Sequence, residues 1–276
     1  MPDQQSDGSA PAGVEFSESF VEADGFRIRY RQAGSGEVLI CLHGGGGLRI
    51  SRAHELLAHS RRLIAFEIPG FGQSPVNDRS ASMEELAGTM NAAVAALGID
   101  HYSIMGNSFG SKVALWMAIL RPQVVKAVVV VGPAAIRLPR QGPPPGQLAP
   151  ERAAELLYAH PERQPPIPPL APEIVAKQIA LSTRLLGPPR DEPFEARLRE
   201  LQMPVLALFG THDRVTPPAG AHLFREILPN CHLVMVYDAA HGIDADRPEA
   251  VAALVEDFLS RGDGFLVRRR SGLIYP

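Results

Sequence analysis

Apolar and polar residues alternate near the start of the chain, and continuous apolar runs follow further along. Residues 17–23 and 26–33 alternate on either side of Asp24-Gly25, a dipeptide typical of a two-residue hairpin turn. Short continuous apolar runs are typical of strands that are covered on both faces of a sheet. The pattern therefore predicts an antiparallel hairpin followed by buried strands. These strands are predicted at residues 38–42, 62–68, 101–105, 124–131, 204–209 and 232–236.

Segments with apolar residues at helical spacing separate these runs. In residues 83–97 the apolar residues recur every three or four positions, and Ser82 or Ser80 is available as the N-cap. Because strands that alternate with helices form parallel sheets, we expect an α/β fold with helices flanking a mostly parallel sheet. Further helices are predicted at residues 53–59, 108–120, 150–160, 172–186, 219–227 and 248–259.

The alternation breaks between residues 135 and 200, a segment that holds more than half of the 26 prolines. Proline stands at the start of both helices predicted there, where its missing N–H costs nothing. We interpret residues 135–200 as an insertion of short helices into one domain, formed by residues 16–134 and 201–262. Residues 1–15 are expected to be a flexible leader, and residues 263–276 a C-terminal tail that can fold as a small hairpin.

The composition is that of an ordinary folded protein, with 45% hydrophobic and 21% charged residues. A net charge of −3 offers no basic surface to a nucleic acid, and no apolar stretch is long enough to span a membrane. Cys41 and Cys231 lie beside apolar runs and are expected to be free thiols, which fits a reducing cytoplasm. We therefore expect a cytoplasmic protein that acts on a small molecule, as a monomer or a homodimer.

A glycine-flanked serine follows the apolar run at residues 101–105, where a helix is predicted to begin. Gly106-Asn107-Ser108-Phe109-Gly110 matches G-x-S-x-G, the turn that presents a nucleophilic serine between a strand and a helix. Such a turn strains the serine backbone, and its glycines avoid clashes with the neighbouring strand and helix. Free amides at the start of the helix favour negative charge beside the serine. We predict that Ser108 is a nucleophile.

A second glycine-rich turn follows the strand predicted at residues 38–42. Four glycines come directly after His43, so the backbone here can approach a substrate closely. No G-K-[ST] follows and the spacing does not fit G-x-G-x-x-G, which argues against a phosphate-binding loop. We expect the N–H groups of Gly45 and Phe109 to form an oxyanion hole for a reacting carbonyl. The residues expected to contact the substrate are Gly44, Gly46 and Asn107.

Two later loops carry an acid and a histidine. Asp213 comes soon after one predicted strand, and His241 comes soon after the next. Because the carboxyl ends of parallel strands meet at one edge of the sheet, both side chains can reach Ser108. We predict that His241 is the general base and that Asp213 orients it. Asp238 and Asp244 are alternative acids, although their closeness to His241 in sequence suits a role in shaping its loop.

Together these motifs resemble the α/β-hydrolase superfamily over almost the whole chain, and the order nucleophile, acid, histidine is typical of that superfamily. Residues 67–74, Glu-Ile-Pro-Gly-Phe-Gly-Gln-Ser, resemble its D-x-P-G-x-G-x-S segment, with Glu67 in place of the usual aspartate. The resemblance implies an eight-stranded, mostly parallel sheet and a helical cap, residues 135–200, that selects the substrate. An arginine of this cap is a candidate for binding a carboxylate. The implied mechanism requires neither a cofactor nor a metal ion.

The sequence leaves three functions open. Hydrolysis of a carboxylic ester through an acyl-enzyme on Ser108 is the first choice, because it needs only the triad, the oxyanion hole and an apolar cap. The alternative is carbon–carbon bond hydrolysis of the meta-cleavage-product type, whose motifs resemble the serine turn and the glycine run. Two departures count against it: no tryptophan follows His241, and Gly46-Gly47-Leu48 stands where Gly-Pro-Gly is expected. The third is a catalytically silent ligand receptor on the same fold.

Overall fold

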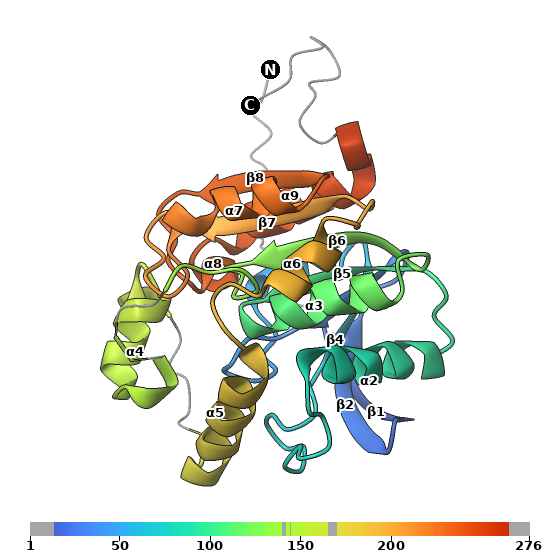
Figure 1. The fold of residues 1–276 in the computed structure, drawn as a ribbon, viewed down its shortest axis with the longest axis horizontal. Coiled ribbons are helices and arrows are strands. Elements are labelled where there is room, and N and C mark those ends of the chain that lie inside the picture. Colours follow the sequence, from blue (N-terminus) through green and yellow to red (C-terminus); the bar gives the residue numbers. More distant parts are fainter. Residues whose placement is uncertain (1–13, 140–141, 144, 165–169, 265–276) are drawn as a thin grey trace, which may run out of the picture.

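The computed structural model describes residues 14–139, 142–143, 145–164 and 170–264. Within these residues the strands are β1 Ser17–Ala23, β2 Phe26–Ala33, β3 Val38–Leu42, β4 Arg62–Phe66, β5 Tyr102–Asn107, β6 Val125–Val131, β7 Val205–Gly210 and β8 Cys231–Val236. They form one eight-stranded sheet in the order β1-β2-β4-β3-β5-β6-β7-β8 (Figure 1). The β1–β2 and β2–β4 pairs are antiparallel, and all other neighbours are parallel. The predicted α/β fold is confirmed.

The strands lie where the apolar pattern predicts them, with ends that differ by at most two residues. The first hairpin turns at Asp24 and Gly25, whose φ angles of 49° and 74° are those of a tight two-residue turn. The central strands are buried on both faces, because helices cover the sheet on each side. Their carboxyl ends therefore open onto a common edge, where the functional loops begin.

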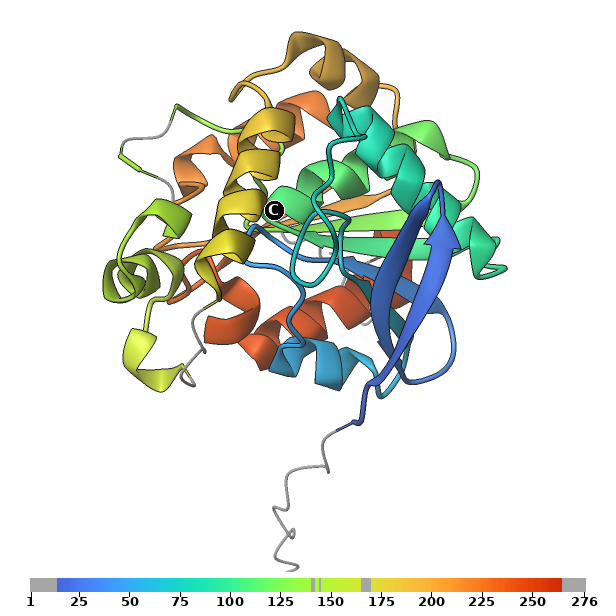
Figure 2. The same ribbon diagram turned by 90° about the horizontal axis from the view of Figure 1, so that it is seen from below.

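Helices form one layer on each face of the sheet (Figure 2). One apolar core joins the sheet to α2, α3, α6 and α7, and the other joins it to α1, α8 and α9. The α-helices are α1 Arg52–Leu57, α2 Met83–Ala96, α3 Phe109–Leu120, α4 Pro150–Leu157, α5 Pro172–Leu186, α6 Glu192–Leu198, α7 His222–Ile227, α8 Ile243–Asp246 and α9 Pro248–Arg261. Short 3-10 helices are Pro145–Gln147, Pro161–Arg163, Pro218–Gly220 and Gly262–Gly264.

The predicted helices are confirmed, including the Ser82 N-cap of α2, which accepts the N–H of Glu85. Two short helices, α6 and α8, were not predicted from the pattern. Within the proline-rich segment α4 and α5 stand over the carboxyl edge of the sheet, whereas α6 lies beside α3 (Figure 1). Phe194 of α6 is fully buried and stacks on Trp116 of α3, with ring centroids 5.2 Å apart. The proposed domain boundaries stay a prediction.

The predicted hairpin of the C-terminal tail and nearly all of the predicted leader lie outside the described residues. Cys41 is buried and Cys231 is half-buried, and both are free thiols. Among the helices of the described residues, none is long and apolar enough to cross a membrane.

Candidate active site

Ser108 stands at the sharp turn between β5 and α3. Its φ of 48° lies in the left-handed region that non-glycine residues rarely adopt. The two flanking glycines have no room for a side chain. A Cβ on Gly106 would lie 2.4 Å from the carbonyl oxygen of Gly110, and one on Gly110 would lie 2.5 Å from that of Leu42. The strain predicted for this turn is therefore present, and it pushes the serine hydroxyl into the cleft.

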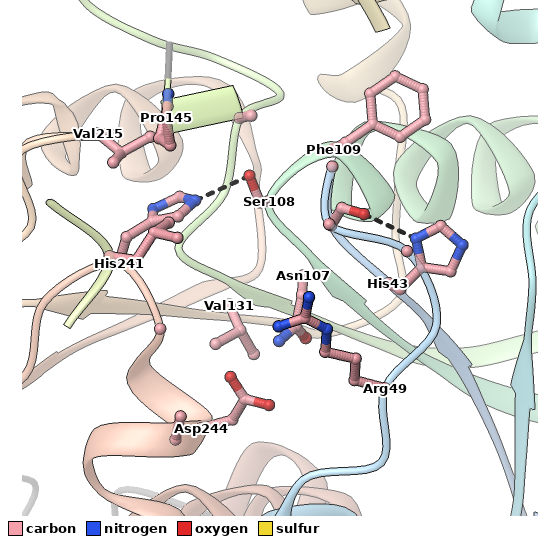
Figure 3. Close-up of a pocket in the computed structure, with 18 of the residues that line it drawn as sticks. His43, Arg49, Asn107, Ser108, Phe109, Val131, Pro145, Val215, His241 and Asp244 are labelled. Carbon is pink, nitrogen blue, oxygen red and sulfur yellow. Dashed lines mark hydrogen bonds between the residues drawn. The ribbon is translucent and has the colours of Figure 1, made fainter. Parts of the chain in front are cut away.

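His241 lies between Ser108 and Asp213. Its Nε2 is 2.9 Å from Ser108 Oγ (Figure 3). Its Nδ1 is 2.9 Å from Asp213 Oδ2. The side chain of Asp213 is fully buried and that of His241 is 8% exposed. This is the arrangement in which a histidine removes the proton of a serine while a carboxylate holds the imidazole ring in place.

The carboxylate of Asp213 is held on both oxygens. Oδ1 accepts the N–H groups of Val215 and Thr216 at 2.7 and 2.8 Å, and Oδ2 accepts the Thr216 hydroxyl at 2.8 Å. Burial disfavours the charged carboxylate, but the neighbouring His241 and the hydrogen bonds from His241 and Thr216 outweigh burial and lower the pKa of Asp213. Asp213 is therefore ionised at neutral pH and can orient a histidine that becomes charged.

The two alternative acids make other contacts. Asp238 accepts a hydrogen bond from His160 Nε2 at 2.9 Å and pairs with Arg247. The hydrogen bond from His160 and the charges of His160 and Arg247 lower the pKa of Asp238. Asp244 lines the cavity beside the triad and makes no hydrogen bond or ion pair with the rest of the described chain. Of the three candidate acids, the structure brings Asp213 to the imidazole of His241.

His43 holds the glycine run from the side of the core. Its Nε2 accepts the N–H of Ile68 at 3.0 Å, so its Nδ1 carries the proton and donates to the Gly44 carbonyl at 2.7 Å. Burial lowers the pKa of His43 to about 4, which keeps the ring neutral. The same carbonyl accepts the N–H of Gly47 at 3.2 Å. Because the peptide is planar and trans, the N–H of Gly45 points away from these partners.

Two backbone N–H groups beside Ser108 have no partner among the described residues. Neither Gly45 nor Phe109 donates its N–H to another group of the described chain. Phe109 is the first residue of α3, where a helix leaves its N–H groups unpaired. Gly44 packs directly against the serine, since a Cβ there would lie 3.1 Å from Ser108 Cβ. This geometry suits an oxyanion hole.

A cavity of about 780 Å³ opens over Ser108. Its walls include Gly44, Gly46 and Asn107. Its roof comes from the proline-rich segment and includes Leu157, Tyr158, Arg163, Gln178, Ile179 and Leu186. Within the described residues, no group of three or more His, Cys, Asp or Glu side chains is placed to hold a metal ion.

Arg49 of the core also lines the cavity, whereas the sequence pointed only to arginines of the cap. Arg49 follows the glycine run by two residues and extends along the cavity toward Asn107 (Figure 3). Asp244 lies at the same end of the cavity. The closeness of Arg49 to the glycine run was the one signal in the sequence. Thr216 and Gln178 were also missed.

Comparison with known proteins identifies the scaffold. Residues 37–162 match the family model of the alpha/beta hydrolase fold, and residues 183–264 match the model of a TAP-like protein. The chain has the α/β-hydrolase fold. This hydrolase is 27% identical to 2-hydroxymuconate semialdehyde hydrolase of Pseudomonas putida, over 87% of this chain and 93% of that protein.

Solved structures of serine hydrolases share the fold. A serine hydrolase involved in carbazole degradation matches with a TM-score of 0.71 and 23% identity, over 89% of this chain and 99% of that one. The naproxen esterase of Bacillus subtilis matches with a TM-score of 0.71 and 18% identity, over 89% and 92% of the two chains. At these identities the likeness concerns the fold alone.

Proposed function

We propose that this hydrolase cleaves a carbon–carbon bond in a vinylogous 1,5-diketone that carries a 2-hydroxycarboxylate or its keto form. The names of the relatives that span most of the chain support this reading more than ester hydrolysis. Besides the semialdehyde hydrolase, they include a 2-hydroxy-6-oxononadienedioate/2-hydroxy-6-oxononatrienedioate hydrolase of Pseudomonas putida, 28% identical over 84% of this chain and 91% of that protein. Each of these substrates carries a carboxylate beside a hydroxyl-bearing carbon.

One observation of the cavity carries the proposal: Arg49 and Asp244 lie at the same end without pairing. Arg49 is exposed and Asp244 is half-buried, and neither makes a hydrogen bond or ion pair with the described residues. A 2-hydroxycarboxylate offers an anion to the guanidinium and a hydroxyl donor to the carboxylate. Asn107 lies between this end of the cavity and the serine. The carboxylate of such a substrate would then lie at the Arg49 end of the cavity, away from the carbonyl that Ser108 attacks.

The triad supplies the chemistry. His241 takes the proton of Ser108, whose oxygen adds to the carbonyl carbon of the ketone, and the N–H groups of Gly45 and Phe109 hold the oxyanion. When the carbonyl re-forms, the bond to the neighbouring carbon breaks. This step needs the keto form of the substrate, in which the proton of the 2-hydroxyl has moved to the carbon next to the ketone. The electron pair of the broken bond then passes along the conjugated chain to the 2-oxo oxygen, and the resulting dienolate takes the proton from His241. Water, deprotonated by His241, then cleaves the ester on Ser108 and leaves a carboxylic acid.

The experiment compares two substrates on one protein. We expect kcat/KM for 2-hydroxy-6-oxo-6-phenylhexa-2,4-dienoate, the compound named for a relative, to exceed that for p-nitrophenyl esters of any acyl length. Arg49→Met should lower kcat/KM for the dienoate about tenfold, because a charge-assisted hydrogen bond is lost. The uncharged esters are the internal control and should keep their kcat/KM.

Each contrary result names a different function. If kcat/KM is higher for the esters than for the dienoate, and Arg49→Met does not change it, the protein is a carboxylesterase. A wild-type protein that fails to react with a fluorophosphonate probe, under conditions that label another serine hydrolase, would be a ligand receptor rather than an enzyme.

A further inference from the structure

Helix α5 of the cap contacts the core through two buried leucines, Leu181 and Leu185, and through polar side chains. Lys177 donates to the carbonyl of Ser74, and Arg184 donates to the carbonyl of Asn77. Both acceptors belong to the loop that follows β4, beside which α5 lies (Figures 1 and 2). Between these two contacts Gln178 is buried, with 4% of its surface exposed. A buried amide must find partners for both its oxygen and its nitrogen.

Gln178 finds those partners in two different loops of the core. Its Oε1 accepts the N–H of Gly72 at 2.9 Å, and its Nε2 donates to the carbonyl of Gly45 at 3.3 Å. The N–H of Gly72 can only donate, so it fixes which end of the amide faces which loop. The amide nitrogen of Gln178 therefore points at the glycine run beside Ser108.

The glycine run has little else to hold it. It carries no side chains, and glycine gains the most backbone freedom when a contact is lost. On the core side, His43 and Gly47 hold the carbonyl that precedes the Gly45 N–H. On the cap side, Gln178 holds the carbonyl that follows it. The two peptide groups that flank the Gly45 α-carbon are thus fixed by different parts of the molecule.

We infer that Gln178 is a positioning residue that completes the oxyanion hole when α5 is docked on the core. The inference rests on the proposed role of the Gly45 N–H. When α5 lifts away, Gly45 loses one of its two anchors and its N–H is no longer held toward the reacting carbonyl. Docking of the cap then assembles the site around a bound substrate, rather than only closing the cavity.

The test uses p-nitrophenyl butyrate and a fluorophosphonate, because both need Ser108 and its oxyanion hole but not the diketone chemistry. Gln178→Met fills the same space and removes both hydrogen bonds. We expect kcat and the fluorophosphonate labelling rate to fall about tenfold, a part of the 10²–10³-fold loss typical when an oxyanion donor is removed. KM should change less than twofold, because the cavity wall keeps its shape.

Two further variants separate Gly45 from cap docking in general. Gln178→Glu keeps an acceptor for Gly72 but offers no donor to Gly45, so it should lose at least as much kcat as Gln178→Met. Lys177→Met removes the neighbouring α5 contact, which reaches Ser74 and not the glycine run. It should keep wild-type kcat.

Three outcomes would overturn the inference: wild-type kcat in Gln178→Met, wild-type kcat in Gln178→Glu, or an equal loss of kcat in Lys177→Met. A wild-type protein that reacts with the fluorophosphonate but leaves the diketone intact would overturn the proposed function alone.

Discussion

Two buried carboxylates follow two parallel strands and are held in the same way, yet of the two only Asp213 contacts the histidine that reaches the Ser108 hydroxyl. Glu67 comes directly after β4 and Asp213 soon after β7, and their residues are 1% and 3% exposed. On Glu67, Oε1 accepts the N–H groups of Gln73 and Ser74 and the Ser74 hydroxyl, all at 3.1 Å. Asp213 likewise accepts two backbone N–H groups and one hydroxyl from the turn that follows it.

The two carboxylates differ in the partner of their second oxygen. Glu67 Oε2 accepts from Arg29 at 2.5 Å, and Asp213 Oδ2 accepts from His241 at 2.9 Å. A guanidinium keeps its charge at every pH that the protein meets, so the first pair is a fixed structural link. An imidazole gains and loses a proton near neutral pH, so the second pair can take part in a reaction. The same backbone framework thus serves as an anchor or as a catalytic support, depending on whether its partner can titrate.

Removing the charge of Asp213 should have the largest effect. Asp213→Asn preserves the size of the side chain but can hold the wrong tautomer of His241, with its proton on Nε2. We expect kcat to fall about 10⁴-fold, as is typical for this change in a Ser-His-Asp triad. Steady-state kinetics with p-nitrophenyl butyrate would measure the loss, and a thermal melt would show that the variant is folded.

Glu67→Gln is the matched control at the other carboxylate. It leaves the half-buried Arg29 beside a neutral amide, with Glu18 at 3.0 Å as its remaining charged partner, so the free energy of unfolding should fall by about 2 kcal/mol. Its kcat should stay within about threefold of wild type, since Glu67 contacts no reacting group. Similar losses of kcat in the two variants would show that the two carboxylates do not divide their roles in this way.

His43, which lies near Glu67, should make the stability of the folded chain depend on pH. Burial lowers the pKa of His43 to about 4, and its ring bonds only backbone groups. Above pH 6.5 both the folded and unfolded chains hold this histidine neutral. Below pH 6.5 His43 binds a proton in the unfolded chain, whereas in the folded chain it stays neutral down to about pH 4. The free energy of unfolding therefore falls by about 3 kcal/mol between these two pH values.

Urea unfolding between pH 7 and pH 4.5 would measure this loss. His43→Asn keeps an N–H donor for the Gly44 carbonyl but cannot titrate, so its free energy of unfolding should fall less steeply over the same range. Equal slopes in the variant and in wild type would mean that another group causes the acid sensitivity.

The sequence predicted the parts of the site that rest on local patterns. Strand runs, the G-x-S-x-G turn and the chain order of Ser108, Asp213 and His241 each follow from short-range residue choice, and the structure brings these three side chains together. The contact of Gln178 with Gly45 spans 133 residues and depends on how the cap docks, which no periodicity encodes. The helices α6 and α8 are too short for a helical repeat to identify them.

Thr216 was missed although its signal is local. Aspartate in a turn accepts hydrogen bonds from the residues that follow it, and a hydroxyl residue stands three positions after Asp213. In the structure the Thr216 hydroxyl donates to Asp213 Oδ2 and lies 3.3 Å from His241 Nδ1. The Thr216 hydroxyl therefore contacts both Asp213 and His241, and Glu67 has no such histidine partner among the described residues.

The smallest predicted effects concern the hydroxyls of Thr216 and Ser74, which donate to Asp213 and Glu67 respectively. Thr216→Val keeps the shape of the side chain but leaves Asp213 Oδ2 with His241 as its one described partner. The carboxylate and the ring can then rotate together away from Ser108, and we expect kcat to fall about tenfold, the worth of one hydrogen bond to a charged group. Ser74→Ala removes the equivalent hydroxyl from Glu67.

The Ser74→Ala variant should lower the free energy of unfolding by about 1 kcal/mol and leave kcat unchanged, because the Arg29 guanidinium stays protonated and contacts no reacting group. Measuring kcat and the free energy of unfolding in urea for both variants compares the two hydroxyls in both properties. If Thr216→Val cost only stability, the hydroxyl would belong to the fold at both carboxylates. The division between anchor and catalytic support would then rest on Arg29 and His241 alone.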